Sequence, residues 1–244
     1  MINYKLTIEY DGENYFGWQR QKNTVRTIQE TIENALTTIL GKNIKLTGAG
    51  RTDTGVHAYN QIANFRTESN ITPEKFLYSL NGILPKDIRV KSIKKTDNDF
   101  HSRYSARKRE YIYKLTMTDR AIERQYFHRL IYKIDFSVLD EFIDFLTGIK
   151  YFKSFCKNKT DKHNFQCNLD YLGYRYNKTK SEIIFKIRAD RFLHSMVRAI
   201  IGCSIDIARN RLNLNEIKEK IIKGENIKAN YLPGKALFLN KIYY

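Results

Sequence analysis

Cysteine, proline and long hydrophobic runs are all scarce in this sequence of 244 residues. Its three cysteines, Cys156, Cys167 and Cys203, are an odd number in a long chain, which predicts free thiols instead of a disulfide framework. Cys156, His163 and Cys167 lack a fourth partner and the spacing of a zinc finger, so we expect no metal site. The sequence shows neither a run long enough to span a membrane nor the apolar core of a signal peptide. These absences predict a cytoplasmic protein with no membrane partner.

Acidic residues are also few, with 26 Asp and Glu against 43 Lys and Arg, which gives a formal net charge of +17. Such an excess favours a polyanionic partner, because basic side chains that neutralise phosphates release condensed counterions. An anionic membrane would need an amphipathic basic helix or a lipidation signal, and neither is present. Hydrophobic residues make up 42% of the chain, enough for a folded core. The composition therefore indicates a folded protein that binds nucleic acid.

The hydrophobic periodicity predicts an α+β protein built from two similar halves. Strands are expected near residues 3–10, 45–47, 57–65, 88–93, 109–117, 170–177, 182–189 and 236–243, and helices near 25–40, 72–82, 137–148, 192–205 and 213–223. No low-complexity linker divides the chain, and we expect one domain over residues 1–108 and a second over residues 109–244.

The segment from Gly48 to Gly55 places three glycines around one carboxylate, Asp53. In isolation such a loop is a tight connection between strands, with the carboxylate accepting from local N–H groups. Its glycine spacing also resembles a Walker A loop, but Val56-His57 stands where that motif requires a lysine and a hydroxyl residue. We therefore reject a nucleotide-phosphate loop, and no cofactor motif is present.

Four sequence motifs occur in order along the chain. They read YDGENYFGWQRQ from Tyr10, GAGRTDTGVHA from Gly48, FHSRYSARKREYIY from Phe100 and FLHSMVRAIIG from Phe192. Each resembles a motif of the tRNA pseudouridine synthase A family, of the bacterial type, and the second resembles the family's G-x-G-R-T-D-x-G-V-H-A signature. The C-terminal stretch 229–237 and residues 119–170 match the family weakly, which weakens the expectations on dimerisation and target choice.

The resemblance implies an isomerase (an intramolecular transferase) that needs no cofactor and converts uridine to pseudouridine at positions 38–40 of the tRNA anticodon stem-loop. It also implies a homodimer whose subunits have an extended, mostly antiparallel sheet and a basic cleft between the two halves. Two alternatives stay open: the same chemistry at other tRNA or RNA positions, and a non-catalytic RNA-binding protein on the same scaffold.

By this resemblance, three residues carry the chemistry. Asp53 is the catalytic carboxylate, acting at C1′ as a nucleophile or at the 2′-hydrogen as a base. Tyr111 matches the active-site tyrosine that contacts the uracil, although a core tyrosine alternating with Tyr113 would show the same pattern. Arg198 matches the arginine that pairs with the aspartate, and a cation in so apolar a helix needs such a partner.

Three further residues are candidates for substrate binding. Arg51 matches the family position at the mouth of the site, where it can reach phosphate or take the place of the flipped base. His57 matches the signature and is equally well explained as a structural histidine. Arg103 lies beside Tyr104 in a stretch of cations and aromatics suited to RNA, part of which can also be a solvated face.

Overall fold

The structure is a computed structural model that describes residues 1–24, 26–157 and 164–244. His163, considered above as a metal ligand, lies outside these residues. Within the described residues, no helix has the length and apolarity needed to cross a membrane, and His, Cys, Asp and Glu side chains form no group of three that could hold a metal. The chain divides into two compact units, Met1–Arg107 with Phe238–Tyr244 and Lys108–Leu237.

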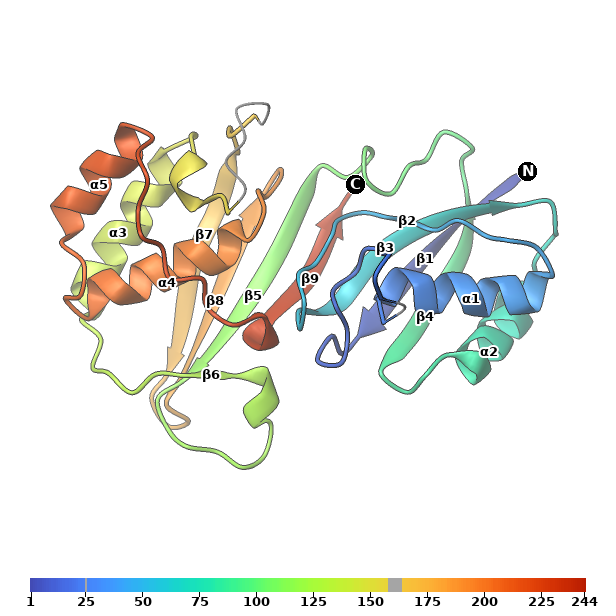
Figure 1. The fold of residues 1–244 in the computed structure, drawn as a ribbon, viewed down its shortest axis with the longest axis horizontal. Helices are drawn as coiled ribbons and strands as arrows, with labels where there is room; N and C mark the ends of the chain where they lie inside the picture. Colours follow the sequence, from blue (N-terminus) through green and yellow to red (C-terminus); the bar gives the residue numbers. More distant parts are fainter. Residues whose placement is uncertain (25, 158–163) are drawn as a thin grey trace. The chain divides into compact units, whose positions relative to one another are not determined.

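The first unit is a sheet with two helices packed beside each other (Figure 1). Its strands and helices are, in chain order, β1 (Ile2–Tyr10), α1 (Ile28–Leu40), β2 (Thr47–Gly48), β3 (His57–Thr67), α2 (Pro73–Ile83), β4 (Ile88–Thr96) and β9 (Leu237–Tyr243). The strand order is β4-β1-β3-β9, with β2 on β3. β1 runs antiparallel to β3 and β4, whereas β9 is parallel to β3 and pairs Phe238 with His57.

The alternation of buried side chains explains β1, and capping residues explain where α1 begins and ends. In β1, every second side chain from Tyr4 to Tyr10 is buried, as expected for a strand with one face on a core. Helix α1 begins where the Thr27 side chain accepts a hydrogen bond from the Glu30 N–H, and it ends at Gly41 with a φ of 66°. The predicted helix is therefore confirmed, with a start three residues later than expected.

The second unit also combines a mostly antiparallel sheet with helices (Figure 1). Its elements are β5 (Lys108–Thr116), β6 (His128–Arg129), α3 (Phe136–Gly148), β7 (Leu169–Asn177), β8 (Glu182–Ala189), α4 (Met196–Ala208) and α5 (Leu214–Ile222), with short 3-10 helices at Arg124–Tyr126, Lys153–Phe155 and Gly234–Ala236. β8 lies between β5 and β7 and is antiparallel to both, and β6 pairs with β5 in parallel. Helix α4 is buried along almost its whole length.

The predicted α+β class with mostly antiparallel strands is confirmed. Two details differ from the expectation. Helix α4 begins at Met196 and not near Phe192, because Ser195 has a φ of 57° that a helix cannot continue through. The structure also groups residues 238–244 with the first unit, although the sequence prediction placed residues 109–244 in one domain, because β9 pairs with β3. The basic cleft between the halves stays a prediction.

Candidate functional site

The Asp53 loop joins β2 to β3 and is fixed by the segment that follows β1. Trp18 N–H donates to the Thr52 carbonyl at 3.1 Å, and Gly55 N–H donates to the Tyr15 carbonyl at 3.3 Å. The Tyr10 hydroxyl lies 2.8 Å from Thr52 Oγ1 in a buried hydrogen bond. Asp53 itself is half-buried, while the flanking Thr52 is buried. The first and second sequence motifs therefore form one structure around the carboxylate.

Three glycines allow these two segments to approach closely. A Cβ atom on Gly12 would lie 2.0 Å from the Val56 carbonyl oxygen, and one on Gly48 would lie 2.5 Å from the Trp18 indole nitrogen. Gly17 has a φ of 85°, and its Cβ would be 2.5 Å from the Thr52 carbonyl oxygen. Real Cβ atoms do not approach other atoms so closely, so glycine is required at each position.

His57 is buried below the loop, with 1% of its surface exposed, and its ring stacks on Phe238 at a centroid distance of 4.6 Å. Its Nδ1 lies 3.0 Å from the Gly12 nitrogen and 2.9 Å from Asp11 Oδ1. These contacts require opposite states, because a neutral Nδ1 accepts from an N–H whereas a protonated Nδ1 donates to a carboxylate. We assign the acceptor state, since the backbone fixes the Gly12 proton. The environment favours a structural role for His57 over contact with RNA.

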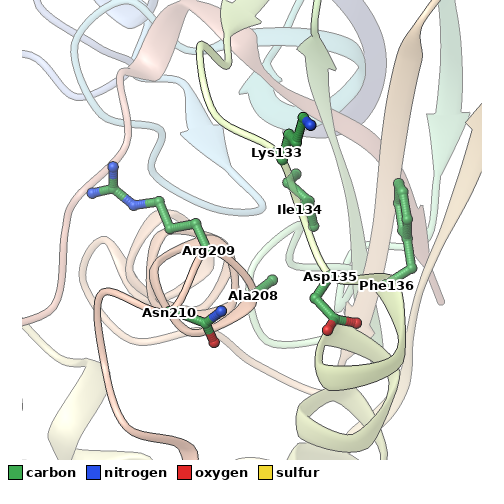
Figure 2. A pocket seen from close by; sticks show the side chains of 7 residues that line it. All are labelled: Lys133, Ile134, Asp135, Phe136, Ala208, Arg209 and Asn210. Carbon is green, nitrogen blue, oxygen red and sulfur yellow. The ribbon is translucent and has the colours of Figure 1, made fainter.

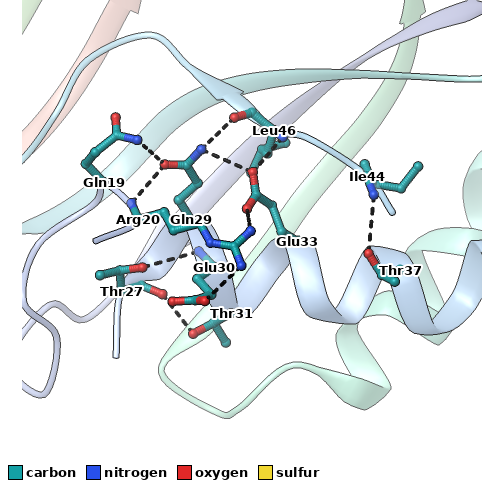
Figure 3. Close-up of polar contacts among 10 residues, drawn as sticks. All are labelled: Gln19, Arg20, Thr27, Gln29, Glu30, Thr31, Glu33, Thr37, Ile44 and Leu46. Carbon is teal, nitrogen blue, oxygen red and sulfur yellow. Dashed lines mark hydrogen bonds and ion pairs between the residues drawn. The ribbon is translucent and has the colours of Figure 1, made fainter. Parts of the chain in front are cut away.

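Arg51 lies on the exposed side of the same loop, and a chain of amides connects it to α1. Its Nε donates to Gln19 Oε1 at 3.0 Å. Gln19 Nε2 donates to Gln29 Oε1 at 2.7 Å, and Gln29 Nε2 donates to the Leu46 carbonyl at 2.9 Å and to Glu33 Oε1 at 3.1 Å (Figure 3). Arg51 therefore has a side-chain partner that is itself held in place.

Two buried carboxylates on α1 complete this network (Figure 3). Glu33, 5% exposed, accepts from the Leu46 N–H at 2.9 Å and pairs with Arg20 at 3.3 Å. Glu30, 7% exposed, pairs with Arg20 at 3.2 Å. Buried carboxylates require such partners, so Arg20 and the residues around it are tied to α1.

Arg103 is exposed on a turn after β4, and its guanidinium lies 5.8 Å from the centre of the Tyr104 ring. Its backbone N–H donates to His101 Nδ1 at 3.2 Å. The position is open to solvent and charged, as a phosphate contact would require.

Tyr111 lies on β5 opposite Ile187 of β8, and 8% of its surface is exposed. The Phe192 ring meets it edge-on, with centroids 5.2 Å apart and planes at 87°. This geometry is favourable for aromatic pairs and fixes the position of the tyrosine ring. Phe192 therefore contributes through its contact with Tyr111 and not as part of α4.

Arg198 lies in the first turn of α4, and its Nε donates to the Leu232 carbonyl oxygen. Burial raises the pKa of Tyr113 well above its usual value, and the positive charge of Arg198 lowers that pKa in part. The Tyr113 hydroxyl donates to the Pro233 carbonyl at 2.9 Å. Residues 229–237, which match the family motif only loosely, thus hold both side chains.

Sequence reasoning did not identify the Arg198–Leu232 and Tyr113–Pro233 hydrogen bonds, because these contacts join segments distant in the chain. Gly202 gave a hint. Its Cβ would lie 1.8 Å from the Asn230 carbonyl oxygen, so the glycine of the fourth motif allows this segment to pack on α4.

The predicted site residues divide between the two units. Arg51, Asp53, His57 and Arg103 belong to the first unit; Arg51 and Asp53 share one loop, and His57 begins β3 directly after it. Tyr111 and Arg198 belong to the second unit. Pairing of Arg198 with Asp53 stays a prediction.

A shallow hollow of about 570 Å³ lies in the second unit, between the end of α4 and the start of α3 (Figure 2). Its described lining is Lys133, Ile134, Asp135, Phe136, Ala208, Arg209 and Asn210, which includes none of the predicted site residues. Asp135 caps α3 there, and Arg209 pairs with Asp206 at 2.7 Å. Asp135 and Arg209 therefore have structural partners, and no residue of the four sequence motifs is among the described lining.

Comparison with known proteins points to the same family that the four sequence motifs resemble. Residues 6–105 and 143–244 match the family described as tRNA pseudouridine synthase. Curated relatives with the name tRNA pseudouridine synthase A include proteins of Thermodesulfovibrio yellowstonii, 36% identical, and Caldicellulosiruptor bescii, 38% identical, each with all of both chains covered. Asp53 and Arg198 lie within the family match, and Tyr111 lies between its two segments.

Proposed function

Because the chain belongs to the tRNA pseudouridine synthase family and is therefore an isomerase acting on tRNA uridine, we propose that Asp53 is its catalytic carboxylate. The observation that supports this role is the fixed, half-buried position of Asp53 in a loop held by a second sequence motif. A preorganised carboxylate loses little freedom when the substrate binds, which is what an efficient nucleophile or base requires.

The reaction rearranges the bonds of one nucleotide. The C1′–N1 bond of uridine breaks, the uracil turns, and a new C1′–C5 bond forms while the C5 hydrogen leaves as a proton and N1 gains one. Asp53 assists either by attacking C1′, which displaces the uracil, or by removing the 2′-hydrogen. Both routes require an ionised carboxylate.

Tyr111 and Arg198 are proposed to complete the site. The Tyr111 ring, fixed edge-on by Phe192, is suited to contact the uracil and to assist proton transfer at the base. Arg198 is a cation at the start of an apolar helix, and a nearby cation favours the ionised form of an aspartate. In this assignment Arg198 pairs with Asp53 when the two units form the site.

We assign Arg51 to the mouth of the site, where its guanidinium contacts phosphate or takes the place of the extruded base. Arg103 is proposed to contact the RNA backbone, and His57 to support the loop from below. The proposed target is uridine 38–40 of the anticodon stem-loop, bound by a cytoplasmic homodimer in a basic cleft. The charge of +17 supports recognition through the phosphate backbone.

The test is pseudouridine mapping on unmodified tRNA transcripts incubated with purified protein and no added cofactor. Wild-type protein should form pseudouridine at positions 38–40, and Asp53→Asn should form none while its tRNA affinity stays within about tenfold, because it removes chemistry and not phosphate contacts. Glu13→Gln, which neutralises an exposed carboxylate on the neighbouring segment, is the matched control and should retain activity.

Each result separates the alternatives. Normal turnover by Asp53→Asn would end the assignment of the carboxylate. Pseudouridine at other positions would change the target but keep the chemistry. Tight tRNA binding without pseudouridine would support a non-catalytic RNA-binding protein.

A further inference from the structure

An aromatic side chain outside the proposed reaction site is displayed to solvent on the turn after β4. Tyr104 is 78% exposed, although tyrosine usually buries much of its ring. The His101 ring lies beside it at a centroid distance of 4.3 Å, and the Arg103 guanidinium lies 5.8 Å from the ring centre. Protein neighbours therefore orient the ring while most of its surface stays accessible.

Local hydrogen bonds fix the backbone of this turn. His101 Nδ1 accepts from the N–H groups of Arg103 and Tyr104 at 3.2 and 3.3 Å. The Ser105 N–H donates to the His101 carbonyl at 2.9 Å, and Ser105 Oγ accepts from the His101 N–H at 3.1 Å. The ring is consequently presented by an ordered turn, which lowers the entropy cost of binding a ligand.

A buried polar network anchors the same turn to the sheet. Ser102, which is fully buried, donates through both its N–H and its hydroxyl to Asn64 Oδ1, at 2.9 and 2.8 Å. Asn64 Nδ2 donates to Asn3 Oδ1 at 3.0 Å, and Asn3 Nδ2 donates to the carbonyls of Asp97 and Phe100 at 2.9 Å each. Buried and satisfied amides of this kind specify one arrangement, so the turn has a fixed position on β1 and β3.

The charge around the turn favours a polyanion. Its cationic side chains and those that contact it are Lys5, Arg66, Arg103 and Arg107, and the nearby carboxylates are Asp97 and Asp99. Exposed aromatic rings next to arginines are the surface on which single-stranded nucleic acids stack their bases. An unpaired base of an RNA is therefore a better match for Tyr104 than a second protein surface, which in a homodimer would bring like charges together.

The strand geometry separates Tyr104 from the Asp53 loop. Asn3, at one end of β1, holds the Tyr104 turn, and Tyr10, at the other end, contacts Thr52. Seven residues of extended strand span roughly 23 Å at about 3.3 Å each. A base stacked on Tyr104 cannot be the uridine that reacts at Asp53.

We propose that Tyr104 is a stacking platform for an unpaired base of the tRNA substrate, at a nucleotide distant from the reacting uridine. The proposal rests on the proposed function for the identity of the RNA. Tyr104 then contributes to tRNA binding and not to the chemistry. Its turn is a second place on the first unit, besides the Asp53 loop, at which the tRNA is bound.

The direct test is fluorescence of Tyr104→Trp titrated with unmodified tRNA transcript. The chain has a single tryptophan, Trp18, which is 2% exposed, so the introduced indole supplies the responsive emission. Stacking on a base should quench this emission. Tyr78→Trp is the matched control, because Tyr78 is 84% exposed on α2, and tRNA should leave its emission unchanged. A fully paired RNA duplex should not quench Tyr104→Trp.

Affinity and turnover give the second measurement. Tyr104→Ala should weaken tRNA binding by about tenfold, the loss typical of one base–aromatic contact, and Tyr104→Phe should restore most of it. KM should rise by more than kcat falls, because the contact is distant from the chemistry. Tyr78→Ala should bind like the wild type.

Equal tRNA affinities for Tyr104→Ala and Tyr78→Ala, with no quenching of Tyr104→Trp, would overturn the proposal. So would a change of oligomeric state in Tyr104→Ala at unchanged tRNA affinity, which would assign the ring to a protein contact. Failure of wild-type protein to form pseudouridine, with quenching still present, would instead reject the proposed function and leave the stacking platform in place.

Discussion

The backbone at Gly17 lies against the carbonyl of Thr52, so closely that a Cβ atom at residue 17 would be 2.5 Å from the Thr52 oxygen. The same hypothetical atom would lie 3.1 Å from the Asp53 carbonyl carbon. The position of the proposed catalytic carboxylate therefore depends on a residue 36 positions earlier in the chain.

Gly17→Ala should destabilise the protein by about 2 kcal/mol or more, because it adds a backbone clash at a positive φ of 85°. Pseudouridine formation should fall as well, since the Thr52–Asp53 backbone must move. Urea unfolding and tRNA turnover measure the two effects. Gly50→Ala is the control for stability, because a Cβ there meets nothing within 4 Å. Equal unfolding midpoints for the two variants would contradict the proposed packing.

Gly202→Ala should displace residues 229–233 from α4, because its Cβ would lie 1.8 Å from the Asn230 carbonyl oxygen. The displacement would remove the Leu232 carbonyl from Arg198 and lower both stability and turnover. Gly148→Ala, at the end of α3 with open space around its Cβ, should be close to neutral. Thermal unfolding of both variants checks this prediction, and a stable, active Gly202→Ala would show that the segment can shift without harm.

We expect Gln19 to affect turnover of the RNA through Arg51, because Gln19 Oε1 accepts a hydrogen bond from Arg51 Nε at 3.0 Å. Gln19→Ala should lower kcat/KM several-fold in the wild-type background and have little further effect in Arg51→Ala. A double-mutant cycle of kcat/KM on tRNA transcripts measures this coupling. Additive losses would mean that Gln19 and Arg51 contribute independently, and the amide chain to Gln29 would then be only a support for the fold.

His128 should make the protein less stable in mild acid. Burial lowers the pKa of His128 below its usual value of 6.5, and the charge of Lys235 lowers it further. The unfolded chain therefore binds a proton more readily, and stability is greatest above pH 6.5 and falls as the pH drops through the folded-state pKa. Urea unfolding at pH 7.5 and 5.5 measures the loss, which His128→Gln should reduce. An unchanged pH dependence in His128→Gln would assign the acid sensitivity to other groups.

Much of the fold could be predicted because its determinants are local. The alternating side chains of β1, the capped and amphipathic α1, and the β7–β8 hairpin are readable from short stretches of sequence. The start of α4 was missed because the apolar pattern continues through Phe192 and Leu193, whereas Ser195 breaks the helix with a left-handed φ.

The candidate site was predicted less completely, because its supports are contacts between distant segments. Motif resemblance predicts roles for Asp53 and Arg198, but no local pattern indicates that Tyr113 donates to Pro233 or that His57 stacks on Phe238. The same holds for the β3–β9 pairing, which joins residues 57 and 238 and moves the last strand into the first unit.

The return of β9 to the first unit also has a consequence for the order of events during synthesis. A ribosome must complete residues 108–237 before it makes Phe238, so the ring that stacks on His57 is made long after residues 1–107 of the same unit. We expect a nascent chain that stops before Phe238 to carry the Asp53 loop with one side of His57 uncovered. The loop proposed to carry the catalytic carboxylate is thus translated early, but its support is complete only after Phe238 has been made.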